Sequence, residues 1–181
     1  LAAKENMRTG SFAQKLCVSS QGNVDSIKNA QLEEGQKGLL FSLSNHKVLY
    51  ANGIYDKVYP ASITKIMTAM LALQSGKLND TVTITQDNVT LEDGSQVCGF
   101  VAGDQVTLDQ LLHCLLVYSG NDAASAIAEY VGGSTENFVQ MMNDYAAKLG
   151  CTGTHFSNPH GLQDENHYTT PYDMAMLARK A

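Results

Sequence analysis

The sequence predicts an α+β fold, because short strand-like runs come first and a group of helices follows them. Residues 38–43 and 47–51 are mostly apolar and flank a polar stretch at residues 44–46, which is typical of a β-hairpin. Between residues 107 and 150, apolar periodic segments are separated by glycines and by residues that cap helices. We therefore expect a β-hairpin followed by a helical cluster.

The segment that links these two regions, residues 59–76, has the pattern of a strongly apolar helix. Pro60 fixes φ just ahead of it, and Gly76 supplies the usual stop. Its apolar residues leave almost no polar face, which predicts one helix buried on all sides. These residues are Ile63, Ile66, Met67, Ala69, Met70, Leu71, Ala72 and Leu73.

Two polar residues inside this apolar helix, Ser62 and Lys65, are the first candidates for chemistry. They are three positions apart, so they share one helix face and their side chains can touch. Burial disfavours the charged form of a lysine and lowers its pKa, which makes Lys65 a suitable base for the Ser62 hydroxyl. A serine activated in this way becomes a nucleophile. Ser62 also falls in the first helical turn, where free backbone N–H groups favour a developing negative charge.

Serine and lysine three positions apart are a common pairing, and the chain contains a second example, Ser44 and Lys47. That pair lies among polar turn formers between two apolar runs, which is typical of a solvated hairpin turn. Only Ser62 and Lys65 are carried by a helix whose pattern requires burial. The sequence context therefore favours this pair over the other.

The composition bounds the possible functions. The chain has 181 residues with 18 acidic and 12 basic side chains, and its net charge of −6 argues against a nucleic-acid binder. One sizeable core accounts for this length, and residues 1–30 form a polar segment in which we expect no chemistry. No apolar stretch reaches the ~18 residues of a membrane span, and no basic-then-apolar signal opens the chain. Because it begins at Leu1, we expect a mature or trimmed form.

Neither the cysteines nor the histidines show a metal-ligand spacing. No CxxC pair occurs, and Cys114 lies in an apolar run where a buried free thiol is expected. Three histidines fall in the loop-like residues 151–169, at intervals that fit neither a helical pair nor a zinc finger. We expect ordinary loop hydrogen bonds there, without a metal or cofactor. The residues are Cys17, Cys98, Cys114, Cys151, His155, His160 and His167.

Strand and capping patterns place the remaining elements. Residues 81–84 alternate as a half-buried strand should. Thr107 and Gln110 are spaced as a capping box for an apolar helix that opens within residues 104–107 and stops at residues 118–120. Further helices are expected from caps at Asn121, at Ser134 or Thr135, and at Thr170 with Pro171 and Asp173 following.

The triplet Ser119, Gly120 and Asn121 allows two interpretations. A glycine that ends one helix and an asparagine that caps the next need no catalytic role. The triplet nevertheless begins 57 residues after Ser62 (119 minus 62), between two helices that we expect to pack near the buried one. In that arrangement its hydroxyl and amide would face Ser62 and Lys65.

Three long strings carry a resemblance to a known family. They read PASITKIMTAMLAL, GDQVTLDQLLHCLLVYSGNDAA and THFSNPHGLQDENHYTTPYDMAMLAR, within residues 38–179. They resemble the successive signatures of the serine D-alanyl-D-alanine carboxypeptidases, the low-molecular-mass penicillin-binding proteins, whose serine and lysine motif is of the S-x-x-K type. The resemblance implies an α+β fold of the β-lactamase/transpeptidase type, with a helical cluster packed on an antiparallel sheet that is incomplete in this chain.

The resemblance also implies roles for the motif residues. Ser62 corresponds to the acyl-enzyme nucleophile, Lys65 to its base and Ser119 to a proton relay to the leaving group. Asn121 corresponds to a contact to Lys65 and the substrate amide, and Gly120 to a substrate-binding position. The implied substrate is the D-alanyl-D-alanine end of a peptidoglycan stem peptide in the bacterial cell envelope outside the cytoplasm. The implied inhibitors are β-lactams, and no metal or cofactor is required.

One family signature, a Lys-Thr-Gly strand downstream of the helices, is missing. Residues 151–153 read Cys-Thr-Gly, but they lack the basic residue and directly follow a helix, so we expect a turn there. We therefore expect residues 31–181 to be the N-terminal part of a catalytic domain, with the third motif and the remaining strands beyond Ala181. A partner or a swapped segment that covers the sheet edge is the alternative.

Two other functions remain open. A class A-like β-lactamase shares the serine and lysine but uses a glutamate to hydrolyse the acyl-enzyme, and Glu165 is the acid nearest a suitable place. A non-catalytic penicillin-sensing or wall-binding module would keep the pocket without turnover. The missing third motif favours that second alternative.

Overall fold

The computed structural model describes residues 24–25, 32–44 and 47–181. The chain divides into two compact units, each described by itself below. The first unit comprises residues 1–59, 146–155 and 168–180, and the second comprises residues 60–145 and 156–167 with Ala181.

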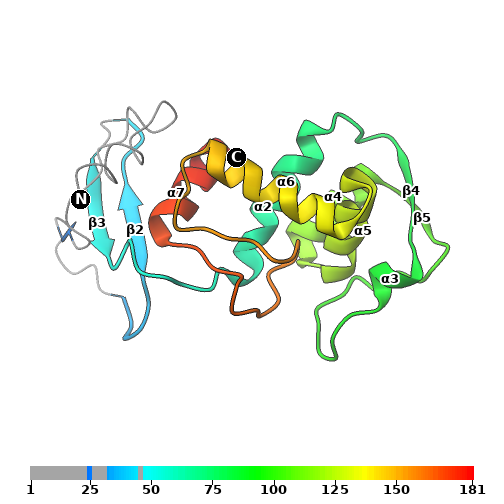
Figure 1. Cartoon of the computed structure of the whole chain (residues 1–181), viewed down its shortest axis with the longest axis horizontal. Coiled ribbons are helices and arrows are strands. Elements are labelled where there is room, and N and C mark those ends of the chain that lie inside the picture. Colours follow the sequence, from blue (N-terminus) through cyan, green and yellow to red (C-terminus); the bar gives the residue numbers. More distant parts are fainter. Residues whose placement is uncertain (1–23, 26–31, 45–46) are drawn as a thin grey trace. The chain divides into compact units, whose positions relative to one another are not determined.

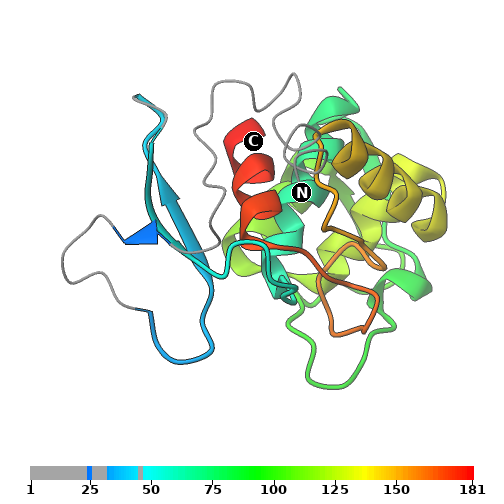
Figure 2. The same ribbon diagram turned by 60° about the vertical axis from the view of Figure 1, so that its left-hand side comes forward.

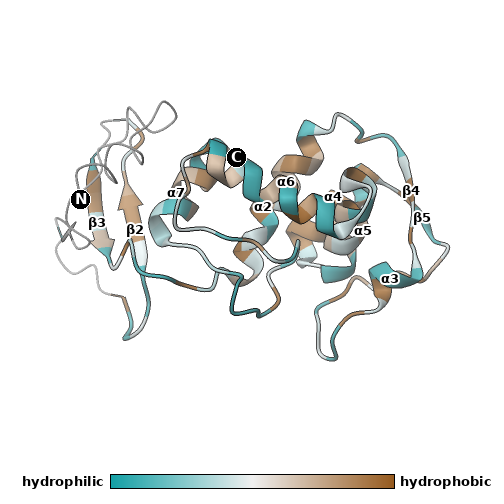
Figure 3. Cartoon of the chain, in the orientation of Figure 1, coloured by the Kyte–Doolittle hydropathy of each residue, from teal (hydrophilic) through white to brown (hydrophobic). Residues whose placement is uncertain are grey.

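A three-stranded antiparallel sheet with the strand order β1-β3-β2 lies in the first unit (Figure 1). The predicted hairpin is confirmed, because β2 pairs with β3, although turn residues 45–46 lie outside the described residues. Strand β1 was not expected, since it falls within the polar segment of residues 1–30. Figure 3 shows β2 and β3 as largely hydrophobic ribbons. The strands are β1 (Val24–Asp25), β2 (Gly38–Phe41) and β3 (Val48–Asn52).

Helix α7 (Pro171–Lys180) contacts β2 in the same unit and starts as predicted. The Thr170 hydroxyl caps it by accepting the backbone N–H of Asp173 at 3.1 Å. The buried Asp173 carboxylate in turn accepts the backbone N–H of Gly153 at 2.7 Å and the hydroxyl of Thr154 at 2.8 Å. Residues 152–153 therefore form the expected turn, which this carboxylate fastens to the start of α7.

The second unit is a helical cluster (Figure 2) with a two-stranded ribbon, labelled β4 and β5 in Figure 1. Its elements are η1 (Ala61–Thr64), α2 (Lys65–Gln74), β4 (Thr81–Thr83), α3 (Gln86–Val89), β5 (Gln105–Thr107), α4 (Leu108–His113), η2 (Cys114–Tyr118), α5 (Asn121–Gly132) and α6 (Thr135–Lys148), whose last turn belongs to the first unit. Helices α2, α4 and α5 contact one another, and their facing side chains form the core. Fully buried members include Met67, Leu108, Leu111 and Ile127, and Leu115 of η2 is buried as well.

The single helix predicted for residues 59–76 is a 3₁₀ turn, η1, followed by α2. Its middle is buried as expected, but Ile63 and Leu73 are 53% and 54% exposed, so burial on all sides is wrong at both ends. Ala61 explains the irregular start, because its φ of 47° lies in the left-handed region and cannot belong to a regular α-helix.

Helix starts follow the sequence closely, with two corrections. Thr107 and Gln110 form the predicted capping box of α4, and the Ser134 hydroxyl accepts the N–H of Asn137 at the start of α6. Residues 105–107, expected to open α4, instead form strand β5 because β4 offers them a pairing edge. Asn121 does not cap α5: Gly120 holds that position and the Asn121 side chain bonds elsewhere.

Within the described residues, none of the helices is both long enough and apolar enough to cross a membrane. Cys98, Cys114 and Cys151 are free thiols, and Cys17 lies outside the described part of the chain. Cys114 is half-buried rather than buried, because it opens the π-helical turn η2, whose outer residues face solvent.

Candidate active site

The candidate nucleophile, Ser62, lies in the 3₁₀ turn η1 and is exposed to solvent. The residue before it, Ala61, adopts the left-handed conformation, which is strained for a residue with a Cβ atom. Gly161 packs directly against this turn, since a Cβ atom at Gly161 would overlap the carbonyl oxygen of Ala61. The left-handed backbone at Ala61, against which Gly161 packs, thus positions the Ser62 hydroxyl.

The Lys65 side chain is buried, with 3% of its surface exposed, and its amine lies at the centre of a polar cluster. Its Nζ atom lies 3.2 Å from Ser62 Oγ, 2.7 Å from Asn121 Oδ1 and 3.0 Å from the carbonyl oxygen of His160. The predicted contact between the two motif residues is therefore present. Two of its three partners come from distant parts of the chain and are pure acceptors.

Burial lowers the pKa of Lys65 from 10.5 to about 8, because the charged form loses hydration. A neutral amine has two hydrogens and one lone pair. The amide oxygen of Asn121 and the carbonyl oxygen of His160 can only accept, so they take the two hydrogens. The lone pair is then left for Ser62, whose hydroxyl can donate to it.

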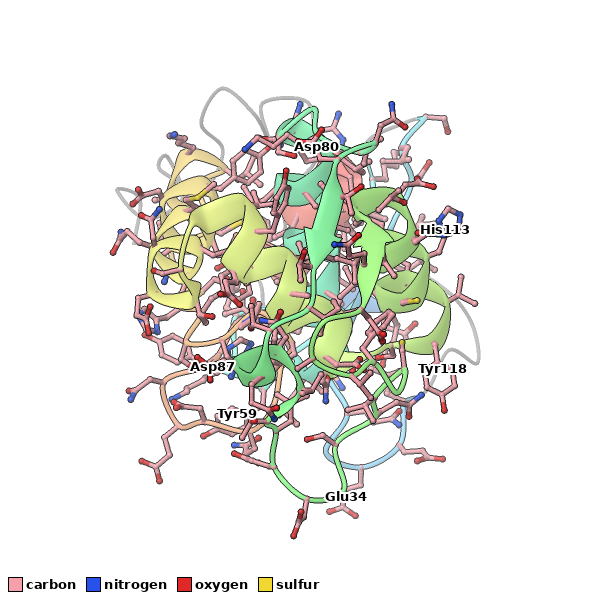
Figure 4. The ribbon with its side chains drawn as sticks, turned by 90° about the vertical axis from the view of Figure 1, so that its right-hand side faces the viewer. Glu34, Tyr59, Asp80, Asp87, His113 and Tyr118 are labelled. Atoms are coloured by element: carbon pink, nitrogen blue, oxygen red, sulfur yellow. The ribbon has the colours of Figure 1, made fainter. Side chains whose placement is uncertain are left out.

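The second serine, Ser119, follows the π-helical turn η2 and also adopts the left-handed conformation, with φ 64° and ψ 33°. Its hydroxyl donates to Ser62 Oγ at 3.1 Å. Tyr118, labelled in Figure 4, precedes it and is 55% exposed. The structure thus brings Ser62, Lys65, Ser119 and Asn121 together, as the sequence analysis expected.

Gly120 differs from the other triplet members because it is buried and its N–H donates to the carbonyl oxygen of Cys114. A Cβ atom at Gly120 would overlap the sulfur of Cys98. The structure therefore gives Gly120 a packing role, because Cys98 lies directly against it.

Sequence reasoning missed Asp122, a buried carboxylate in the first turn of α5. It accepts the backbone N–H groups of Cys98 at 2.9 Å and Gly99 at 3.0 Å. The carbonyl oxygen of Gln96 accepts the N–H of Asn121, so the loop before β5 is fastened to the start of α5 at several points. The one local signal was an acidic residue in the first turn of a helix, where free N–H groups already favour negative charge.

The loop of residues 157–167 supplies further contacts that the sequence did not reveal. The Thr64 hydroxyl lies 2.7 Å from Nε2 of His167, and the Thr68 hydroxyl donates to the carbonyl oxygen of Pro159 at 2.6 Å. His167 accepts the N–H of Ser157 through Nδ1, which is the loop hydrogen bonding that was expected of these histidines. Among the described residues, no three metal-ligating side chains lie together. Glu165 is exposed on the same loop.

Burial, together with the positive charge of Lys65 and the neighbouring His167, lowers the pKa of His160 to about 4. The His160 ring is therefore neutral at pH 7. Its Nδ1 atom accepts the N–H of Leu162 at 3.2 Å, which places the proton of the neutral ring on Nε2.

Comparisons with known proteins show which family this chain resembles. The family model Peptidase_S11, described as D-alanyl-D-alanine carboxypeptidase, matches residues 25–181. The D-alanyl-D-alanine carboxypeptidase DacF of Bacillus subtilis is 38% identical over 167 residues, which are 90% of this chain and 43% of that protein. The crystal structure of the carboxypeptidase DacD from Francisella tularensis matches with a TM-score of 0.77 and 32% identity, over 93% of this chain and 41% of that one. Penicillin binding protein 6B from Escherichia coli matches with a TM-score of 0.77 and 33% identity, over 86% and 51%.

The chain spans about half or less of the length of these relatives. Over that span it shares their α+β fold, which in this chain consists of helices and small antiparallel sheets. Since the family model covers residues 25–181 and the same strings carry the clustered serines and lysine, the chain belongs to the D-alanyl-D-alanine carboxypeptidase family.

Proposed function

We propose that the protein is a serine D,D-carboxypeptidase that releases the terminal D-alanine of a peptidoglycan stem peptide through an acyl-enzyme. The observation that carries the proposal is the environment of the Lys65 amine. Two pure acceptors hold its hydrogens, and the third contact is the hydroxyl of Ser62. Such an amine can take one proton, and the serine beside it supplies that proton as it attacks.

The reaction follows from these contacts. Ser62 Oγ bonds to the carbonyl carbon of the penultimate D-alanine while its proton passes to Lys65. The tetrahedral intermediate then expels the amine of the terminal D-alanine, which receives the proton held by Lys65 through the Ser119 hydroxyl, 3.1 Å from Ser62 Oγ, so Lys65 is again neutral. Water next attacks the ester carbon, loses a proton to Lys65 and regenerates the Ser62 hydroxyl. Neither step uses a metal or a cofactor.

The relatives support the choice of substrate and inhibitor. Several are named D-alanyl-D-alanine carboxypeptidases and one is named a penicillin binding protein. We assign the same substrate end to this protein, with β-lactams as covalent inhibitors and the bacterial cell envelope outside the cytoplasm as its place of action. Asn121 contacts the substrate amide in this proposal, and Gly120 supports that position from behind.

The proposal also includes the division of the domain. We assign residues 31–181 to the N-terminal part of a catalytic domain whose Lys-Thr-Gly strand lies further along the full-length polypeptide. Intact mass of the protein purified from its source tests this assignment, because the chain alone has a mass of 19.5 kDa. A natural product of 19.5 kDa with ordinary carboxypeptidase rates would overturn it.

The test of function uses the full-length natural product with a peptide ending in D-alanyl-D-alanine and with a labelled penicillin. We expect stoichiometric release of free D-alanine and a penicillin adduct that persists. Rapid hydrolysis of the penicillin would instead identify a β-lactamase. A stable adduct without release of D-alanine would identify a penicillin sensor.

A further inference from the structure

The end of η1 and the first turns of α2 bury three polar side chains. Thr64, Lys65 and Thr68, here called the polar stripe, are all buried. Thr68 lies four positions after Thr64 and three after Lys65, so these side chains share one helix face, and the left-handed Ala61 lies in the turn before them. The proposed reaction gives Lys65 a role but leaves both threonines without one. Buried hydroxyls in an apolar helix need hydrogen-bond partners, so the identity of those partners is informative.

A single loop, residues 157–167, contacts all three residues of the polar stripe and also Ala61. Gly161 packs on the Ala61 carbonyl, and His167 bonds to Thr64. The carbonyl oxygen of His160 accepts from Lys65, and that of Pro159 accepts from Thr68 at 2.6 Å. Residues 159, 160 and 161 therefore contact residues 68, 65 and 61 in turn.

We propose that the loop of residues 157–167 sets the direction of the Lys65 amine, and that Thr64 and His167 are the positioning residues through which it does so. This inference rests on the proposed function. The carbonyl oxygen of His160 holds one amine hydrogen, and thereby turns the lone pair towards Ser62. A loop that moves along the helix carries that oxygen with it and turns the lone pair away.

His167 is suited to fix the loop because both of its ring nitrogens are occupied. Nδ1 accepts the N–H of Ser157 at 3.1 Å, so the neutral ring carries its proton on Nε2 and donates it to the Thr64 hydroxyl. The ring is 2% exposed and lies edge-on to Phe156. The bond joins the far end of the loop to the residue directly before Lys65, so it ties the loop to the helix at the point where the amine begins.

Gly161 supports the same conclusion from the other end of the loop. Its φ of 91° and its contact with the Ala61 carbonyl both require the absence of a side chain. The left-handed Ala61 precedes Ser62, and a strained backbone persists only where its surroundings hold it. The loop thus fixes the turn of the nucleophile together with the amine of the base.

The test measures the rate of penicillin acylation against pH in the full-length protein with Thr64→Val, which keeps the side-chain shape and removes the hydroxyl. We expect the rate to fall roughly tenfold, as for a small misplacement of a catalytic group. We also expect the rise of the rate with pH to move above its wild-type position near 8, because a looser loop admits water and raises the pKa of Lys65. His160 and His167 are the titratable neighbours, and the lowered pKa of His160 keeps it neutral over this range.

Thr64→Ser should restore both the rate and the pH profile, because it returns a hydroxyl to His167. Thr169→Val is the matched control: Thr169 is equally buried and its hydroxyl lies 2.8 Å from that of Thr154, in the other unit. It should lower the melting temperature without moving the pH profile. Gly161→Ala should slow acylation more than Thr64→Val.

The outcomes separate the two proposals. A wild-type protein that penicillin does not acylate would defeat the proposed function. A wild-type protein that is acylated, with a Thr64→Val variant whose rate and pH profile match it while its melting temperature falls, would overturn the positioning role and leave the function intact.

Discussion

The chain contains the same serine and lysine spacing twice, in two regions of different structure. Ser44 and Lys47 are exposed at the hairpin of the first unit, where the carbonyl oxygen of Lys47 accepts the N–H of Ser42. Lys65 is buried in the second unit, and its amine reaches Ser62 at 3.2 Å. Spacing alone therefore carries no chemistry. The difference lies in burial, which lowers the pKa of Lys65 to about 8, and in the acceptors that orient its amine.

The largest expected difference between the two pairs is in acylation itself. Ser62→Ala should abolish labelling by penicillin, since it removes the attacking oxygen. Ser44→Ala should leave the rate unchanged, because Ser44 is exposed in a polar turn. Peptide mapping of the labelled protein measures this directly. A label that persists in Ser62→Ala would assign the nucleophile elsewhere.

Exchange of the lysines sharpens the comparison. Lys65→Arg should slow acylation by about three orders of magnitude with the fold intact, because arginine stays protonated and cannot take the serine proton. Lys47→Arg is the control and should react at the wild-type rate. Stopped-flow acylation with circular dichroism distinguishes lost chemistry from lost structure. A near wild-type rate in Lys65→Arg would mean that Lys65 is structural.

A smaller effect is expected from Asn121→Asp. A carboxylate 2.7 Å from the Lys65 amine would favour the charged form and raise its pKa above about 8. Acylation at pH 7 should fall roughly tenfold, and the rise of the rate should move to higher pH. Asn137→Asp adds the same charge at an exposed position and should leave the profile in place. If the acylation rate depended on pH in the same way in both variants, Asn121 would have no influence on the pKa of Lys65.

The smallest effect concerns stability. Between pH 8 and 10.5 the unfolded chain keeps Lys65 protonated while the folded chain does not, so the unfolded state binds more protons. The free energy of unfolding should therefore rise with pH in this window, by on the order of 2 kcal/mol relative to Lys65→Met. Urea denaturation of both proteins at pH 7.5 and pH 10 measures the difference. If the free energy of unfolding changed equally in both proteins between pH 7.5 and pH 10, burial would not lower the pKa of Lys65.

Features that depend on neighbouring residues were predictable from the sequence. The Thr107–Gln110 capping box and the contact between Ser62 and Lys65 both follow from spacings of three residues, and both are present. The pairing of β1 with β3 could not be found in this way, because β1 is two residues long and its partner lies far along the chain. The contact of Lys65 with the carbonyl oxygen of His160 could not be predicted either, because every residue has such an oxygen and the residue type does not show which one accepts.

Asn121 shows why one local rule failed. An asparagine after Ser119 and Gly120 has the usual signature of a helix cap, and its side chain would satisfy free N–H groups there. The buried amine of Lys65 needs an acceptor more strongly, because an unpaired polar group inside a protein costs more than an uncapped helix end. A tertiary demand thus overrode a local preference, at a position that we assign to the site.

The left-handed Ala61 has a consequence for how this position would drift in evolution or in a laboratory selection. Replacement by glycine would relieve about 1 kcal/mol of strain, and would cost about as much again through the greater entropy of the unfolded chain. Alanine and glycine at residue 61 should therefore give nearly the same free energy of unfolding, so selection for thermal stability should not favour either one. If variants selected for catalytic turnover prefer one of these two residues at position 61, the preference must come from the way in which residue 61 positions the Ser62 hydroxyl.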